Sequence, residues 1–549
     1  MAQEGPGLTE LAFAGGGVAP GGVLPHPLSL AMAVMSEVKQ LRGYQRHITS
    51  EFLEDRYPYL EDINGHLKGD QVSMAKGDRL FPRLVEQLEE PGMAPEVLCD
   101  ALCTITDMCS NQEQKCTAIC SDVIAAATNL LMHESVPVRR EAVRVIESLA
   151  LLMGGRSLFP VGNTAMAREL TKAVGSGPTL PRLAKLLLSC DDELLKRNVA
   201  AAYKAITVFR DGCQQVVDQG SVKSIAQYLC ATLPDPPATK PLALCLLDLL
   251  KTLAAVTMYA RDGVRDVFNC GLLEKVIRFL EFVPPGGRIA SATPEDACEI
   301  ARQSLRFLWH CGNDQVGRKE SLKAEGVRVV TRYLTDKDQK VREAGICALN
   351  VIALETQGKK DVLQFSLEAM ADLLHSERET AYLQEACVQL ARGASELPAF
   401  RFAFARRVLD SIWLLEKVYG TTALAAVSPL LFPKEDDDTR TQAAYVTGHF
   451  LALKGEPQSG DTIRVPPVSP SELIEEPALF ALAECVDILH NLLDILDLAR
   501  EPALKCLEIL TNFTRPREEL RKVLSSGRAT APEAAMPEIQ RMLAKQSAN

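Results

Sequence analysis

The chain has 549 residues, more than one hydrophobic core supports, because cores stop growing near about 250–300 residues. Its 47% apolar and 24% charged residues exclude wholesale disorder, and an aromatic content of only 5% argues against an all-β architecture. The net charge of −11 argues against nonspecific binding to nucleic acid or to anionic membranes.

The N-terminal segment has two parts by composition. Residues 1–26 are rich in Gly, Ala and Pro and are predicted to be a disordered tail. They contain acidic residues but no Lys or Arg, which argues against a secretory or mitochondrial signal. Residues 27–77 are predicted to form a helix and loop that cap the array. The apolar run there is shorter than the roughly 20 residues that span a bilayer, so we expect a soluble, cytoplasmic protein.

Residues 78–453 read as a succession of similar helices. The pattern Val138-Arg139-Arg140-Glu141-Ala142 recurs as Val341-Arg342-Glu343-Ala344, 203 residues later, and an apolar stripe of helical spacing follows each copy. Five repeats of roughly 41 residues would fill this interval, and that is the armadillo/HEAT period.

Glycines provide a second recurring signal in this region. Gly220, Gly271 and Gly326 each precede an apolar helix that ends in an aromatic-Leu pair, and Pro-rich insertions lengthen the intervals between them. Residues 454–470 are predicted to be a Pro/Gly/Ser linker, and residues 471–549 a C-terminal helical cap or extension. The predicted fold is all-α, an armadillo/HEAT-like right-handed superhelical solenoid.

Few residues in the sequence indicate a catalytic or metal-binding site. Five clustered cysteines include two pairs spaced four residues apart, but both pairs lie on apolar helical faces and His133 is the only nearby histidine. We therefore interpret these five as buried structural residues rather than a zinc site, in a reducing compartment: Cys99, Cys103, Cys109, Cys116 and Cys120. His310 and Cys311 are adjacent on a helix and do not face each other. The acidic run 435–438 lacks the pattern of a calcium loop. No nucleotide-binding or metalloprotease motif is present, and we predict a protein without catalysis, metal, cofactor or small-molecule substrate.

The remaining candidates are side chains that could line a groove. Trp309 and Asn313, four residues apart on one helix, resemble one rung of the Trp/Asn ladder with which import receptors hold extended basic peptides, and Asn350 lies where armadillo units often place a groove asparagine. For these residues the structural alternative is capping or hydrogen bonding within the array.

Arginines at repeat-equivalent positions form the second candidate set. Arg139, Arg140 and Arg342 either hold acidic residues of the next unit and turn carbonyls, or present a surface to an acidic partner.

Residues 341–350 resemble the third-helix consensus of armadillo repeats, and the turns at Gly271 and Gly326 resemble their inter-helix turns. Within the armadillo superfamily, one family shows a more specific resemblance. The stretch from Ala101-Leu102 through Val138-Arg139 to Gly155-Arg156-Ser157-Leu158-Phe159 is similar to the armadillo-repeat subunits of the ciliary radial spoke. This resemblance implies a non-catalytic scaffold of the ciliary or flagellar axoneme that binds other spoke or microtubule-associated subunits. The alternative is a soluble armadillo adaptor or transport receptor that binds extended peptides in its concave groove.

Overall fold

The computed structural model describes residues 71–151, 179–453 and 485–544, apart from positions 111, 209, 284, 287–288, 377–378, 421–422, 512–513 and 527–530. Every regular element in these ranges is a helix, and they contain no strand. The prediction of an all-α, armadillo/HEAT-like fold is confirmed. The predicted tail, the linker and most of the predicted N-terminal cap lie outside the described residues, so their boundaries stay predictions.

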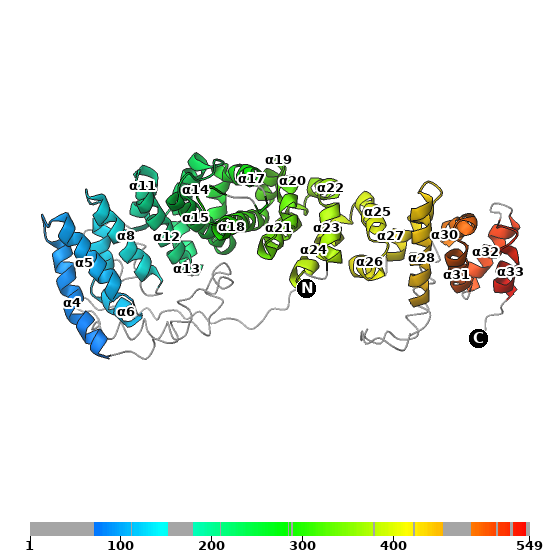
Figure 1. The fold of residues 1–549 in the computed structure, drawn as a ribbon, viewed down its shortest axis with the longest axis horizontal. Helices are drawn as coiled ribbons and strands as arrows, with labels where there is room; N and C mark the ends of the chain where they lie inside the picture. Colours follow the sequence, from blue (N-terminus) through cyan, green and yellow to red (C-terminus); the bar gives the residue numbers. More distant parts are fainter. Residues whose placement is uncertain are drawn as a thin grey trace, which may run out of the picture. The chain divides into compact units, whose positions relative to one another are not determined.

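The chain divides into two compact units, Met1–Ile225 and Ala226–Asn549. Figure 1 shows the helices of each unit following one another in chain order. The helices of the first unit, of which the last crosses the boundary, are α4 (Gln71–Glu89), α5 (Pro95–Met108), α6 (Gln112–Cys120), α7 (Val123–Leu130), α8 (Val136–Ala150), α11 (Thr179–Ser189), α12 (Glu193–Thr207), α13 (Arg210–Asp218) and α14 (Ser221–Thr232).

The second unit continues the same alternation of short and long helices. Its elements are α15 (Lys240–Tyr259), α16 (Gly263–Asn269), α17 (Leu272–Phe282), α18 (Pro294–Gly312), α19 (Gln315–Lys323), α20 (Gly326–Thr331), η3 (Arg332–Thr335), α21 (Gln339–Ile352), α22 (Thr356–Phe365), α23 (Leu367–His375), α24 (Ala381–Ala394), α25 (Pro398–Arg407), α26 (Ile412–Tyr419), α27 (Ala423–Val427), η5 (Ser428–Leu431), α28 (Asp437–Leu453), α30 (Cys485–Asp494), η6 (Ile495–Asp497), α31 (Arg500–Thr511), α32 (Thr514–Ser525) and α33 (Met536–Ala544).

From α6 to α8 and from α16 to α24, each repeat consists of two shorter helical segments followed by a longer third helix, as α19, α20–η3 and α21 illustrate. The third helices pack on one another along the chain: α5 on α8 and α8 on α12 in the first unit, and α15, α18, α21 and α24 in succession in the second. Repeats of about 40 residues with three helices each, in which the third helices of neighbouring repeats are in contact, are the armadillo arrangement.

N-terminal caps start the third helices at defined residues. The Thr293 hydroxyl accepts a hydrogen bond from the Asp296 amide at the start of α18, and Asp338 accepts bonds from the Lys340 and Val341 amides at the start of α21. Thr380 caps α24 in the same way. Such side chains satisfy amides that have no partner within the helix, so the polar residue before each apolar stripe fixes the helix start.

Tight approaches between successive elements require glycine at equivalent places. A Cβ on Gly317 would lie 2.1 Å from the Cys311 carbonyl oxygen, and a Cβ on Gly358 would lie 2.3 Å from that of Ile352. Each glycine lets the first helix of a repeat pack directly against the end of the preceding third helix. The interval from Gly317 to Gly358 is one repeat, and it agrees with the period expected from the sequence.

The turn glycines that the sequence indicates are only partly as expected. Gly220 and Gly271 adopt left-handed backbone conformations, with φ of 67° and 68°. At the third turn the left-handed residue is Glu325, with φ of 57°, and Gly326 is the first residue of α20. Gly326 is needed there for space, because its Cβ would lie 2.7 Å from the Ser321 carbonyl oxygen.

Candidate protein-interaction surface

The predicted groove residues of the second unit are Trp309 on α18, Asn313 at its C-cap and Asn350 on α21. Trp309 and Asn350 are separated by the same interval as Gly317 and Gly358, so they occupy the same position on two neighbouring third helices. The four-residue spacing in the sequence predicts instead a pairing of Trp309 with Asn313 on one helix.

The two residues predicted to form one rung on α18 lie in different surroundings. Trp309 is half-buried, and its ring centroid lies 5.0 Å from that of His310. Asn313 is exposed at the C-terminal end of α18, where its backbone carbonyl accepts a hydrogen bond from Nη1 of Arg318 (3.4 Å).

Asn350 connects two third helices. Its Nδ2 donates to the Ile346 carbonyl (3.2 Å) on its own helix and to the Ala386 carbonyl on α24 (2.8 Å). The amide therefore has the structural role that the sequence analysis gave as the alternative to cargo binding.

Two of the three candidate arginines hold acidic residues of the next repeat. Arg140 binds Asp192 with Nε to Oδ1 at 2.9 Å and a second contact through Nη2, and this pairing lowers the pKa of Asp192. Asp192 also caps α12 through the Leu195 amide. Arg139, beside Arg140 on α8, is half-buried, and its Nε has no hydrogen-bond partner within the described residues.

Arg342 makes the more buried of these contacts. Its Nη2 lies 2.7 Å from Oε2 of Glu379, and its Nη1 donates to the carbonyls of Asp336 (2.7 Å) and Lys337 (3.1 Å). The two ion-paired side chains are only 13% and 9% exposed. Arg140 and Arg342 thus match the structural alternative, in which arginines bind neighbouring acids and turn carbonyls.

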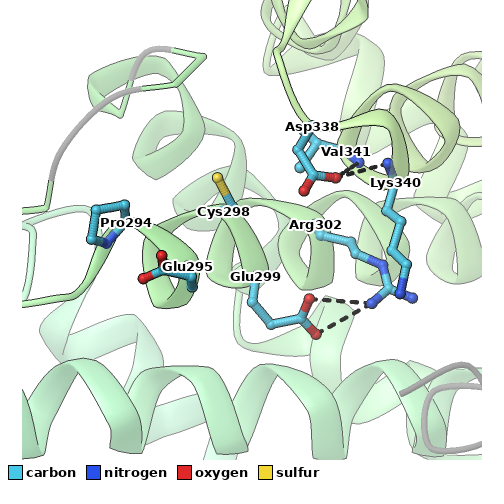
Figure 2. A pocket seen from close by; sticks show the side chains of 8 residues that line it. All are labelled: Pro294, Glu295, Cys298, Glu299, Arg302, Asp338, Lys340 and Val341. Carbon is cyan, nitrogen blue, oxygen red and sulfur yellow. Dashed lines mark hydrogen bonds and ion pairs between the residues drawn. The ribbon is translucent and has the colours of Figure 1, made fainter. Parts of the chain in front are cut away.

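A shallow hollow of about 250 Å³ lies between the N-terminal parts of α18 and α21 (Figure 2). The residues that line it are Pro294, Glu295, Cys298, Glu299, Arg302, Asp338, Lys340 and Val341. Glu299 is bound to Lys251 (3.3 Å), Arg302 (3.2 Å) and Gln303 (2.8 Å), and Asp338 caps α21. Burial, with Asp336 and the acids of the hollow, raises the pKa of Cys298, so its thiol stays protonated and is a poor nucleophile.

The other chemical candidates from the sequence are internal or paired. His310 and Cys311 are buried, and Nδ1 of His310 donates to the Ala254 carbonyl at 2.8 Å. Burial raises the pKa of the Cys103 thiol to about 11. In the acidic run, Glu435 and Asp436 both contact Arg406.

The predicted cysteine cluster is less uniformly buried than expected. Cys109 is buried but Cys99 and Cys103 are half-buried, and the side chains of Cys116 and Cys120 lie outside the described residues. Within the described ranges, no three His, Cys, Asp or Glu side chains converge as a metal site would require.

Exposed polar and aromatic side chains gather where α24 packs against α26. Glu385, Gln389 and Arg392 are exposed on α24 at helical spacing, and Trp413 is exposed on α26. We call these four residues the α24–α26 surface.

Among the helices that the structure describes, one, α15, is long and apolar enough to cross a membrane by length and composition. Its most apolar window is 72% buried inside the protein, as expected for a core helix of the array.

Comparisons with known proteins give resemblances among solved structures alone. No family model matches the chain, and no curated protein matches it. An engineered protein aligns with 17% identity over 85% of this chain and 98% of its own length, with a TM-score of 0.47. A designed armadillo repeat protein, and another in complex with the peptide (KR)4, each align with 16% identity over 50% of this chain and 99% of their own, with TM-scores of 0.38.

Proposed function

We propose that this chain is a non-catalytic scaffold that binds other proteins through its third helices. The observation that carries the proposal is the row of exposed side chains Glu385, Gln389 and Arg392 on α24. Hydrogen bonds between α21 and α24 hold this helix in place. A rigid array that offers polar side chains at helical spacing suits recognition of an extended segment or of another helix.

We further propose that the partners belong to the axoneme of cilia or flagella, in the radial spoke. This rests on the sequence resemblance of the region 101–159 to radial spoke armadillo subunits. On the same ground we propose that the protein is located in the cytoplasm and in the axoneme of the cilium or flagellum.

Proximity labelling with the full chain in a ciliated cell tests both parts. Under the proposal, spoke or microtubule-associated proteins are labelled, and a triple variant Glu385→Ala, Gln389→Ala, Arg392→Ala loses most of that labelling while its circular dichroism is unchanged. The matched control is Glu320→Ala with Lys323→Ala, an exposed pair on α19.

The outcomes separate the two parts of the proposal. Labelling of cytosolic or nuclear cargo without axonemal proteins would leave the soluble adaptor as the function and reject the spoke. Labelling that is unaffected by the triple variant would reject the α24 face as the binding surface.

A further inference from the structure

Trp413 is a large aromatic side chain that the fold leaves open to solvent. It is 51% exposed, whereas Trp309, the other tryptophan of the chain, is half-buried. Exposed tryptophans are enriched at the energetic centres of protein interfaces. Nζ of Lys417 lies 5.0 Å from the Trp413 ring centroid, a cation–π distance that shows a cation already seated against this indole.

Lys417 also anchors the helix that carries the ring. Its Nζ lies 3.3 Å from Oε2 of Glu385 on α24, and its backbone carbonyl accepts hydrogen bonds from the guanidinium of Arg392, with Nε at 3.1 Å. These three contacts hold α26 against α24. The indole is therefore oriented before a partner arrives, and less conformational entropy is lost on binding.

The charges around Trp413 are predominantly acidic. Asp410, just before α26, has a side chain that is 77% exposed, with Nε2 of His375 at 3.5 Å from its Oδ1 and Arg407 nearby. Glu416 is exposed one turn after the ring. Glu416 has no ion pair within the part of the chain that the structure describes. The nearby cations are already engaged, Lys417 with Glu385 and Arg392 with a backbone carbonyl, so the charge that complements this site is positive.

We propose that Trp413 and Glu416 bind an arginine side chain of a partner protein, with Asp410 adding attraction from nearby. A planar guanidinium stacks on an indole and donates paired hydrogen bonds to a carboxylate, which a lysine ammonium does less well. The inference rests on the proposed function as a scaffold, and it identifies the partner group that one residue of the α24–α26 surface, Trp413, would bind.

The test uses the full chain and a fluorescein-labelled peptide of three arginines alternating with glycine, with binding followed by fluorescence anisotropy. We expect Trp413→Ala and Glu416→Gln each to weaken binding about five-fold or more. The control, Glu320→Ala with Lys323→Ala at the exposed pair on α19, leaves it unchanged. A peptide with citrulline in place of arginine keeps the shape but loses the charge, and we expect it not to bind.

Equal affinity of Trp413→Ala and the unaltered chain for the arginine peptide would overturn the proposal, and so would equal binding of the citrulline peptide. Because Trp413 is exposed, its replacement leaves the core intact, and circular dichroism checks this. If peptide binding does not need Trp413 but the triple α24 variant still loses its labelled partners, the arginine contact fails while the scaffold function stands.

Discussion

At the residue scale, burial decides the chemistry of His310. The side chain is 2% exposed between α15 and α18, and this burial lowers its pKa to about 4 despite the hydrogen bond to Ala254. The folded state therefore resists protonation, and His310 is a packing residue whose neutral form the array requires.

This pKa predicts how stability depends on pH. The unfolded chain binds a proton at His310 below pH 6.5, but the folded chain binds it only near pH 4, so stability falls as pH decreases through that window, by about 3 kcal/mol in full. Urea unfolding between pH 7 and pH 4.5 should show this slope, and His310→Gln should flatten it. His375→Gln, on a side chain that is 33% exposed, is the control. An unchanged slope in His310→Gln would contradict the assignment.

At the element scale, the glycines that begin the first helices set the spacing of the repeats. A Cβ at Gly358 would overlap the Ile352 carbonyl, so we expect Gly358→Ala to lower the free energy of unfolding by about 1–3 kcal/mol. Gly393, inside α24, has nothing within 4 Å of its Cβ position, and Gly393→Ala should be neutral or stabilise by up to about 1 kcal/mol. Chemical denaturation measures the free energy of unfolding of both variants. Similar losses in Gly358→Ala and Gly393→Ala would reject the steric argument.

Ion pairs between repeats are a second element-scale feature, and their worth depends on burial. The Glu379 side chain is 9% exposed, and Arg342→Ala removes the guanidinium that pairs with its carboxylate. We therefore expect the free energy of unfolding to fall by about 2–3 kcal/mol. The exposed Lys323–Glu320 pair on α19 should contribute less than about 1 kcal/mol to the free energy of unfolding. Double-mutant cycles measure both couplings, and a coupling for the Arg342 pair as small as that of the exposed pair would show that the turn carbonyls matter more.

At the scale of the whole molecule, stability is a sum over repeats and their neighbours rather than one cooperative core. The chain has two compact units, so we expect urea unfolding in more than one step. Gly212→Ala, whose Cβ would lie 1.8 Å from the Ile206 carbonyl oxygen, should destabilise the first unit, and Gly358→Ala the second. Hydrogen exchange followed by mass spectrometry locates each effect, and simultaneous loss of protection throughout would argue for a single cooperative unit.

The sequence by itself determined the class of fold and the repeat period. The recurrence of Val-Arg-Glu-Ala and the turn glycines fixed all-α repeats, because helix formation depends on local spacing and on the polar residue before each apolar stripe. It also raised the structural role of the arginines as one of two alternatives.

Tertiary structure alone decided which residues meet and which remain exposed. Arg342 reaches Glu379 because α21 and α24 are neighbours, and Asn350 reaches the Ala386 carbonyl for the same reason. The burial of His310 and the exposure of Trp413 likewise depend on elements distant in sequence. The physical reason is that local patterns specify each helix, whereas burial and pairing of a side chain depend on the surface of the neighbouring repeat.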